Sequence, residues 1–441
     1  MIKSLKDKYI KEGILFESKL NFLKETEKYS KQELINYQDE QLRKIIRHAY
    51  KYVPYYRELF YENKLCLDDI RSQNDLWKIP ILTKEDVKNN FEKLKSTKHP
   101  KKILNLAKTS GTTGSPLKIY RDMNSIILEN AIVWRQWNWS GLNVGDNIAV
   151  LRGERIINSD RKKTPYWIYD KITHRLKLSP IHITDETIPD YIEAIKSHDC
   201  KVLQAYPSNA YVLALYMVKH KIKLKLNGVF TSSEPVYSFQ RTVIEEAFDC
   251  KIWDFYGMAE RVTSSSECSS HSGLHINEEY GITEFLNGEN LDPNKGILIG
   301  TSLHNYGMPL IRYKTSDFAE IQLGECNCGM KHRVIKPIES RLQDMIITRD
   351  GKYLSPSGLT LIIKELPNIK ESQIIQNTKD DYEIKIVEEG KFSRDTELVL
   401  KNKMEEVLGD TANIDIKLVN EIERTKNGKF RWIISRVEKG A

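Results

Sequence analysis

Short apolar runs alternate with helical patterns in the middle of the chain, and this alternation constrains the fold more than any other feature. The strand-like runs are residues 147–152, 201–206, 228–233 and 251–257. Residues 208–221 and 238–249, which lie between the later runs, carry apolar side chains at helical spacing. This β-α-β-α order predicts an α/β domain with a largely parallel sheet, whose ligands bind at the carboxyl ends of the strands.

The chain before and after this region has a different pattern. About sixty residues at the start look helical, and Pro54 interrupts that pattern near its end. From about residue 297 the chain is rich in strand-like runs. We predict that residues 1–340 form one large N-terminal domain, in which mixed and parallel sheets are flanked by helices.

A smaller second unit is predicted over residues 341–441. It contains several strand-like runs and a charged helix at residues 394–409. A mixed segment of about 100 residues suits a small mobile α+β lid better than a continuation of the sheet.

Composition excludes several classes of protein. Of the 441 residues, 40% are hydrophobic and 29% are charged, which argues against collagen-like, low-complexity and disordered chains. No apolar run approaches the roughly 20 residues of a membrane span, and the N-terminus lacks an apolar signal region, so we expect a cytoplasmic protein. The net charge of +7 comes without a recognition helix or RNA-binding motif, so a nucleic-acid partner is not expected.

The sequence TSGTTGSPLK, residues 109–118, is the strongest local signal. Its glycines let the backbone approach an anion, and its hydroxyl and N–H groups can donate to phosphate oxygens. The spacing differs from that of the nucleoside-triphosphatase P-loop. Composition alone leaves open both a phosphate-binding loop and an ordinary polar surface turn.

Six motifs, in this order, resemble those of the AMP-forming adenylate-forming enzymes. They are TSGTTGSPLK, TSSEPV (231–236), DFYGMAE (254–260), GTSLHNYGMPLIRYKTSD (300–317), SRLQDMI (340–346) and RTKNGKFR (424–431). The N-terminal HAYKYVPYYRELF and the segment PILTKED narrow the resemblance to the phenylacetate–CoA ligase-like branch, which includes members associated with capsule biosynthesis. The resemblance covers roughly residues 45 to 436 and implies the adenylate-forming enzyme fold.

The resemblance also implies a set of ATP-binding residues. The phosphate loop would use Thr109, Ser110, Gly111, Thr112, Thr113, Gly114 and Lys118; the adenine would meet Ser233, Glu234, Pro235, Tyr256 and Gly257; and the ribose would meet Asp317. Glu260 would hold Mg²⁺, a hard cation that prefers carboxylate and phosphate oxygens. Taken singly, Glu260, Tyr256 and Asp317 are better explained as a turn acid, a core aromatic residue and a turn or helix-cap residue. Their order along the chain reverses that preference.

Lys429 and Arg341 are the catalytic residues that the resemblance implies besides Glu260. An ammonium group that bridges the incoming carboxylate and the nucleotide would stabilise the charge that develops on the phosphoryl oxygens. The resemblance further implies that the C-terminal unit rotates after adenylation, about a hinge near residue 340. Ser340 and Gln343 depart from the usual hinge pattern, which bears on the second half-reaction more than on adenylation.

The implied reaction has two steps. A carboxylic acid attacks ATP to give an acyl-adenylate and pyrophosphate, and a thiol, expected to be coenzyme A, then accepts the acyl group. A carrier protein or a sugar remains open as the acceptor, as in surface-polysaccharide acylation. A non-catalytic nucleotide-binding relative is the alternative from another class. Neither the acid nor the oligomeric state can be inferred, and a homodimer stays open.

Cysteine and histidine residues form a second constellation. A reducing compartment disfavours disulfides, so a cysteine cluster is better interpreted as a metal site. Cys326 and Cys328 form a tight pair, and Cys268, His271 and His275 occur in an earlier segment. Four such ligands would make a closed structural Zn²⁺ site, although the C-x-C spacing is tighter than usual and ordinary loop residues are the alternative. The resemblance implies Cys268, His275, Cys326 and Cys328 as ligands, with His271 as the spare candidate.

The acyl pocket is weakly encoded. Tyr206, Pro207 and Ser208 follow a strand-like run and are better candidates to face the acid than the tryptophans at 134, 137 and 139, which fit a core. His182 and His304 are further candidates, although a lone histidine is usually a scaffold residue.

Overall fold

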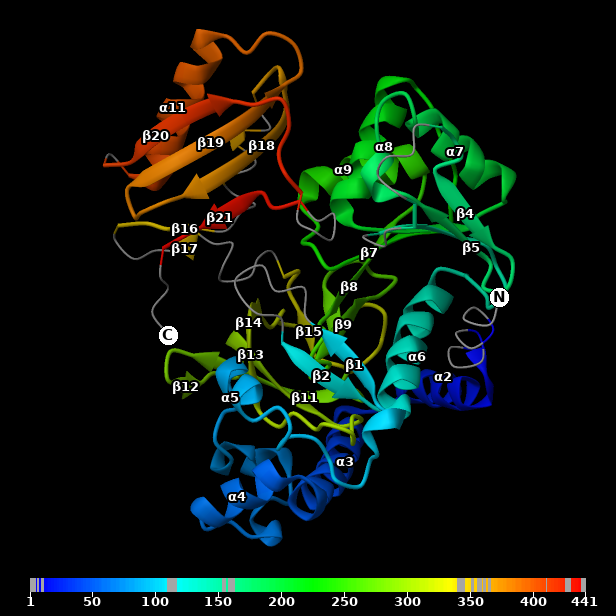
Figure 1. The fold of residues 1–441 in the computed structure, drawn as a ribbon, viewed down its shortest axis with the longest axis vertical. Coiled ribbons are helices and arrows are strands. Elements are labelled where there is room, and N and C mark those ends of the chain that lie inside the picture. The colour runs from blue at the N-terminus through cyan, green and yellow to red at the C-terminus, as the bar shows by residue number, and fades with distance from the viewer. Residues whose placement is uncertain are drawn as a thin grey trace.

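The computed structural model describes residues 5, 8, 12–108, 117–152, 156–157, 163–338, 346–349, 353–354, 359, 362–363, 366–409, 411–424 and 430–437 (Figure 1). Among these residues, no helix is both long and apolar enough to cross a membrane.

A nine-stranded sheet forms the centre of the molecule. Its order is β15 (Val334–Ile335), β10 (Leu274–Ile276), β9 (Ser264–Glu267), β8 (Ile252–Gly257), β7 (Gly228–Ser232), β6 (Val202–Ala205), β3 (Ile148–Leu151), β5 (Arg175–Leu178) and β4 (Trp167–Asp170). The five strands from β8 to β5 are parallel, and the strands at both ends are antiparallel. The α/β class with a mixed, largely parallel sheet is therefore confirmed.

Helices cover both faces of this sheet. On one face, α7 (Ile188–Ser197), α8 (Pro207–Lys219) and α9 (Ser238–Phe248) pack against strand residues that include Val229. On the other face, α2 (Ile14–Thr26) and α6 (Met123–Trp139) pack against residues that include Phe230. Neighbouring residues of a strand point to opposite faces, so β7 serves both cores. Trp134 and Trp137 of α6 are buried in the second core, as the sequence predicted.

A second sheet and the N-terminal helices lie below the main sheet in Figure 1. The sheet has the order β12 (Asn290–Leu291), β11 (Gly281–Asn287), β13 (Lys295–Ser302) and β14 (Tyr313–Glu320). The helices are α3 (Lys31–Tyr52), α4 (Pro54–Glu62) and the short α5 (Lys84–Asn89). Pro54 interrupts the helical pattern as predicted, and it occupies the first turn of α4, where its missing N–H costs nothing.

Two smaller features complete the N-terminal part. A hairpin of β1 (Asn105–Lys108) and β2 (Lys118–Arg121) flanks residues 109–116. Short 3₁₀ helices occur at Leu67–Asp69, Gln73–Lys78, Lys101–Ile103 and Pro180–His182.

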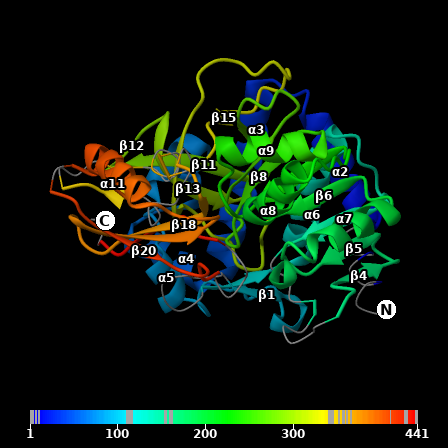
Figure 2. The ribbon, with the colours of Figure 1, turned by 90° about the horizontal axis from the view of Figure 1, so that it is seen from above.

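The C-terminal part has its own sheet and core. The sheet has the order β20 (Asn413–Leu418), β19 (Asp381–Glu388), β18 (Ile369–Gln376) and β21 (Ile433–Ser435), and α11 (Arg394–Leu408) packs on it. Before them in the chain, β16 (Ile346–Ile347) pairs with β17 (Tyr353–Leu354). Figures 1 and 2 show this unit beside the main sheet, away from β4. The predicted boundary at residues 340 and 341 lies outside the described part of the chain.

Candidate active site and metal centre

The carboxyl ends of the parallel strands bring several predicted residues together. Ser233, Glu234 and Pro235 follow β7, while Tyr256 and Gly257 end β8, the neighbouring parallel strand. Ser233 has a φ of +73°, a left-handed conformation that non-glycine residues rarely adopt and that clusters at functional sites. These five residues therefore line one edge of the sheet, where open α/β sheets bind ligands.

Tyrosine hydroxyl groups position the two predicted acids beside this edge. Tyr256 donates a hydrogen bond to Oδ2 of Asp317 at 2.7 Å. Tyr313 donates to Oε1 of Glu260 at 3.2 Å, and burial together with the Glu260 charge raises the pKa of Tyr313 far above its usual value. Tyr313 and Asp317 both belong to β14, so one strand of the second sheet places both acids next to β8.

The predicted phosphate loop is described only at its ends. Residues 109–116 lie outside the described part of the chain, and so do Lys429 and Arg341. Lys118 is exposed in β2 and pairs in register with Lys108 of β1. The roles of these residues remain predictions.

Two arginines near the candidate site were not predicted from the sequence. Arg121, at the end of β2, donates to the carbonyl of Ala259 and so supports the turn that carries Glu260. Arg152, just after β3, donates to Oγ of Ser233 at 3.3 Å, and its guanidinium lies 5.5 Å from the centre of the Tyr206 ring. Neither position carries a motif signal, because arginines at strand ends are common on protein surfaces.

Two of the candidate acyl residues, Tyr206 and Ser208, occupy the same edge. Tyr206 follows β6, and the backbone N–H of Ser208 donates to Glu234 at 3.1 Å. His182 hydrogen bonds to Ser179 and stacks on Tyr166. His304 is buried against the ring of Tyr280. Their relation to the acid remains a prediction.

The C-terminal unit contacts the segment that follows β7. The backbone N–H of Phe430 donates to Oε1 of Glu234 at 3.3 Å. The ring of Trp432 meets the edges of Tyr237 and Phe239, with centroids 6.0 and 5.5 Å away. The segment expected to line the adenine therefore also supports the C-terminal unit.

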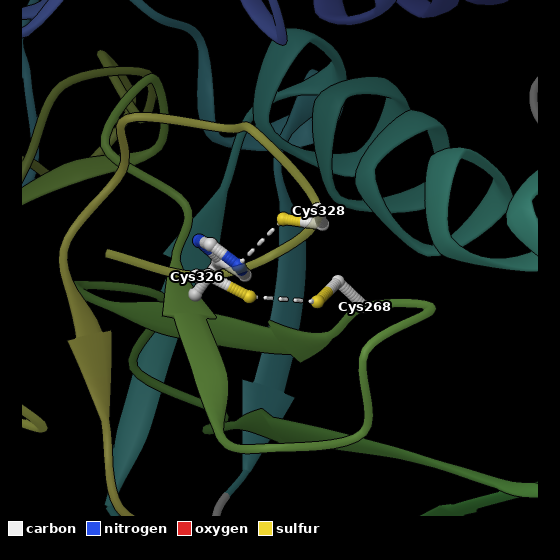
Figure 3. A group of neighbouring side chains, drawn as sticks. Cys268, Cys326 and Cys328 are labelled. Atoms are coloured by element: carbon white, nitrogen blue, oxygen red, sulfur yellow. Dashed lines mark hydrogen bonds between the residues drawn. The ribbon is translucent and has the colours of Figure 1, made fainter. Parts of the chain in front are cut away.

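The four predicted metal ligands form one group (Figure 3). Their ligand atoms lie within 4.8 Å of one another; the Cys268 and Cys326 sulfurs are 3.5 Å apart, and the Cys328 sulfur is 3.2 Å from Nε2 of His275. In a tetrahedron with Zn–S bonds of about 2.3 Å, two sulfurs lie about 3.8 Å apart. The group therefore has the composition and size of a structural zinc site.

The surroundings of His275 favour a neutral imidazole whose Nε2 can bind a cation. Its Nδ1 lies 3.3 Å from the carbonyl oxygen of His332, which can only accept, so Nδ1 carries the proton and Nε2 keeps its lone pair. Burial lowers the pKa of His275 to about 4. His271 does not join the group, because it contacts Glu267 at 3.3 Å and packs on Trp253.

The thiols differ in their surroundings. Burial raises the pKa of Cys268 to about 12. For Cys326, burial is outweighed by hydrogen bonds from the Cys328 backbone and from Ser270, and the pKa is lowered to about 7.

A buried ionic network lies behind the metal group. Oε1 of Glu279 accepts hydrogen bonds from Arg135 at 2.7 Å, from His332 at 3.0 Å and from Thr26. Arg135 also donates to Asn277 at 2.7 Å. The network joins α2 and α6 to the chain on either side of the metal ligands.

Comparisons with known proteins agree with the motifs. A family described as the CapK C-terminal domain matches residues 346–436. Protein CapK of Staphylococcus aureus is 25% identical, with 92% of this chain and 90% of that protein covered. A phenylacetate-coenzyme A ligase of Thermus thermophilus is 24% identical, with 93% and 98% covered.

A solved relative was determined in more than one state. 2-Hydroxyisobutyryl-CoA ligase in the postadenylation state matches with a TM-score of 0.72 and 18% identity, covering 92% of this chain and 90% of that one. The same ligase in the thioesterification state has a TM-score of 0.56 and 19% identity, covering 93% and 91%. The likeness confirms the predicted fold. This chain is therefore similar to Protein CapK and to phenylacetate-coenzyme A ligases over most of its length, and it has the fold of the solved CoA ligases.

Proposed function

We propose that the chain is an AMP-forming ligase that activates a carboxylic acid with ATP and transfers the acyl group to coenzyme A. The observation that carries this proposal is the meeting of Tyr256, Glu260 and Asp317 beside the segment after β7. The phenylacetate-coenzyme A ligases among the relatives support the same activity.

The chain's residues would divide the work of adenylation. Asp317, fixed by Tyr256, offers carboxylate oxygens to the ribose hydroxyl groups. Glu260, fixed by Tyr313, is placed to hold Mg²⁺, which would neutralise phosphate charge. Lys429 would stabilise the charge that develops on the α-phosphate, and Arg341 would support the hinge-side contacts.

We propose that the Cys–His group holds a structural Zn²⁺. Cys268, His275, Cys326 and Cys328 supply four ligands, which would leave no open position for a substrate. The role of this metal would be to hold the loop before β15 against β9 and β10.

Another acceptor is the main alternative. This alternative is a carrier protein or a sugar as the acceptor in surface-polysaccharide synthesis, and it rests on the resemblance of the motifs to capsule-associated members; Protein CapK matches this chain over most of both lengths. A cytoplasmic location and a homodimer are further parts of the proposal, which cell fractionation and light scattering test.

The experiment that tests the proposed function is pyrophosphate release from Mg·ATP with a panel of aryl, short-chain and long-chain acids, with and without coenzyme A. We expect release that depends on one class of acid and increases with coenzyme A. Glu260→Gln should abolish it, whereas Glu320→Gln, which alters an exposed pair with Lys336, should not. Acid-dependent release without an effect of coenzyme A would favour the carrier-protein or sugar acceptor. ATP binding without release for any acid would favour the non-catalytic relative.

A further inference from the structure

The carboxylate of Glu234 joins two parts of the molecule. Its Oε2 accepts the backbone N–H of Ser208, in the first turn of α8, at 3.1 Å. Its Oε1 accepts the backbone N–H of Phe430, in the C-terminal unit, at 3.3 Å. Each oxygen serves a different part of the chain, so a side chain with only one oxygen cannot replace both contacts.

The contact lies next to the residue proposed to be catalytic. Phe430 directly follows Lys429 in the sequence, and neighbouring Cα atoms are about 3.8 Å apart. A restraint on the Phe430 backbone is therefore a restraint on the chain directly after Lys429. Trp432, two residues further on, packs against Tyr237 and Phe239 from the segment that also holds Glu234.

The arrangement of the two parts resembles one state of a relative. The chain superposes better on 2-hydroxyisobutyryl-CoA ligase in its postadenylation state than in its thioesterification state. The Glu234 contact thus belongs to an arrangement like that of the relative's postadenylation state.

We propose that Glu234 is a positioning residue for the first half-reaction: it holds the C-terminal unit in the adenylating arrangement through the Phe430 backbone. This inference rests on the proposed function. Once the unit moves away, the contact is broken, so Glu234 has no part in the transfer to the thiol. This role replaces, for Glu234, the contact with the adenine that the resemblance implied; such a contact would instead change the KM for ATP.

The kinetic test separates the two half-reactions. Adenylation is measured as pyrophosphate release with the acid that the wild-type chain uses, and thiolation is measured from the chemically prepared acyl-adenylate of that acid with coenzyme A. Glu234→Ala should lower kcat for adenylation about tenfold, the effect of one hydrogen bond to a charged group, with the KM for ATP and the thiolation rate unchanged. Glu234→Gln, which keeps one oxygen, should lie between Glu234→Ala and wild type.

Glu389→Gln is the matched control. Glu389 also joins the two parts, through an ion pair of 3.4 Å with Lys219, but both side chains are more than half exposed. This variant should match wild type in both half-reactions. Equal losses of adenylation and thiolation in Glu234→Ala, or a rise in the KM for ATP alone, would overturn the proposal.

Hydrogen–deuterium exchange tests the same contact without catalysis. In Glu234→Ala the amide of Phe430 should exchange about tenfold faster than in wild type, because its acceptor is lost. Unchanged exchange at that amide would overturn the role of Glu234. If none of the acids makes the wild-type chain release pyrophosphate, the proposed function fails. The exchange rate of the Phe430 amide still decides whether Glu234 holds the C-terminal unit.

Discussion

Replacing Glu279 by glutamine should destabilise the protein strongly. The side chains of Glu279 and Arg135 are 0% and 2% exposed, and their ion pair is 2.7 Å long. The substitution leaves the Arg135 cation buried without a carboxylate, and breaking a buried pair in this way costs about 3–5 kcal/mol. Folded proteins typically have a total stability of about 5–15 kcal/mol, so the variant would stay folded in water if the wild type lies in the upper part of this range and would be partly unfolded if it lies near the lower end.

The loss of unfolding free energy in Glu279→Gln should also depend on pH. Burial alone would raise the pKa of Glu279, but Arg135 and His332 hold it well below the usual value. The carboxylate therefore contributes stability that is present above the unfolded-state pKa, near 4.5, and is lost as the pH falls through the lower folded-state pKa. The difference between wild type and Glu279→Gln should be full at neutral pH and shrink in acid.

Urea unfolding followed by tryptophan fluorescence is the suitable assay. Three of the seven tryptophans, Trp134, Trp137 and Trp253, are buried in the core that α6 forms with the main sheet, so much of the signal reports this region. Glu320→Gln is the control, because its ion pair with Lys336 is similarly short at 2.6 Å but roughly half exposed, and it should cost at most about 1 kcal/mol. Equal losses in the two variants would refute the argument that burial determines the energy.

Three further predictions concern the metal, the chemistry and pH. Cys328→Ser should lower both the zinc content and the melting temperature, whereas Cys250→Ser, outside the metal group, should keep the zinc; normal zinc content in the first variant would remove Cys328 from the ligand set. Lys429→Ala should nearly abolish acyl-adenylate formation and leave ATP binding largely intact, and the reverse result in calorimetry and pyrophosphate assays would contradict its role. Burial raises the pKa of Asp254 to about 7, so wild type should lose stability relative to Asp254→Asn as the pH rises from about 4 to 7; a flat difference in melting temperature would exclude this.

The sequence could predict the parallel strands because they are buried on both faces. Residues of β3, β6 and β7 pack into the cores on either side of the sheet, so each strand is a continuous apolar run. β9 could not be predicted in this way. It consists of three serines and a glutamate, all buried, and Asn277 hydrogen bonds to two of the serines. Such a strand looks like a polar loop until its distant partner is known.

Part of the candidate site could likewise be predicted from the sequence, and part could not. Cysteine and histidine are rare and specific ligands, so the Cys268, His275, Cys326 and Cys328 group was predictable in composition, and the structure brings it together. The contact of Glu234 with Phe430 was not predictable, because it joins a side chain to a backbone amide 196 residues away. The identity of a side chain does not indicate that a distant backbone N–H will be its hydrogen-bond partner.

The position of the metal group at one end of the nine-stranded sheet bears on solubility. β15 covers the outer edge of β10 with only two paired residues, and the chain leading to β15 carries Cys326 and Cys328. An uncovered strand edge offers unpaired N–H and C=O groups to other chains. With the proposed zinc removed, β15 would lose one of its attachments, and backbone hydrogen bonds with Glu320 and Gln322 would have to keep it over the edge that includes the buried Leu274 and Ile276. Loss of the metal would then make this edge easier to open and would raise the tendency of the protein to aggregate through it.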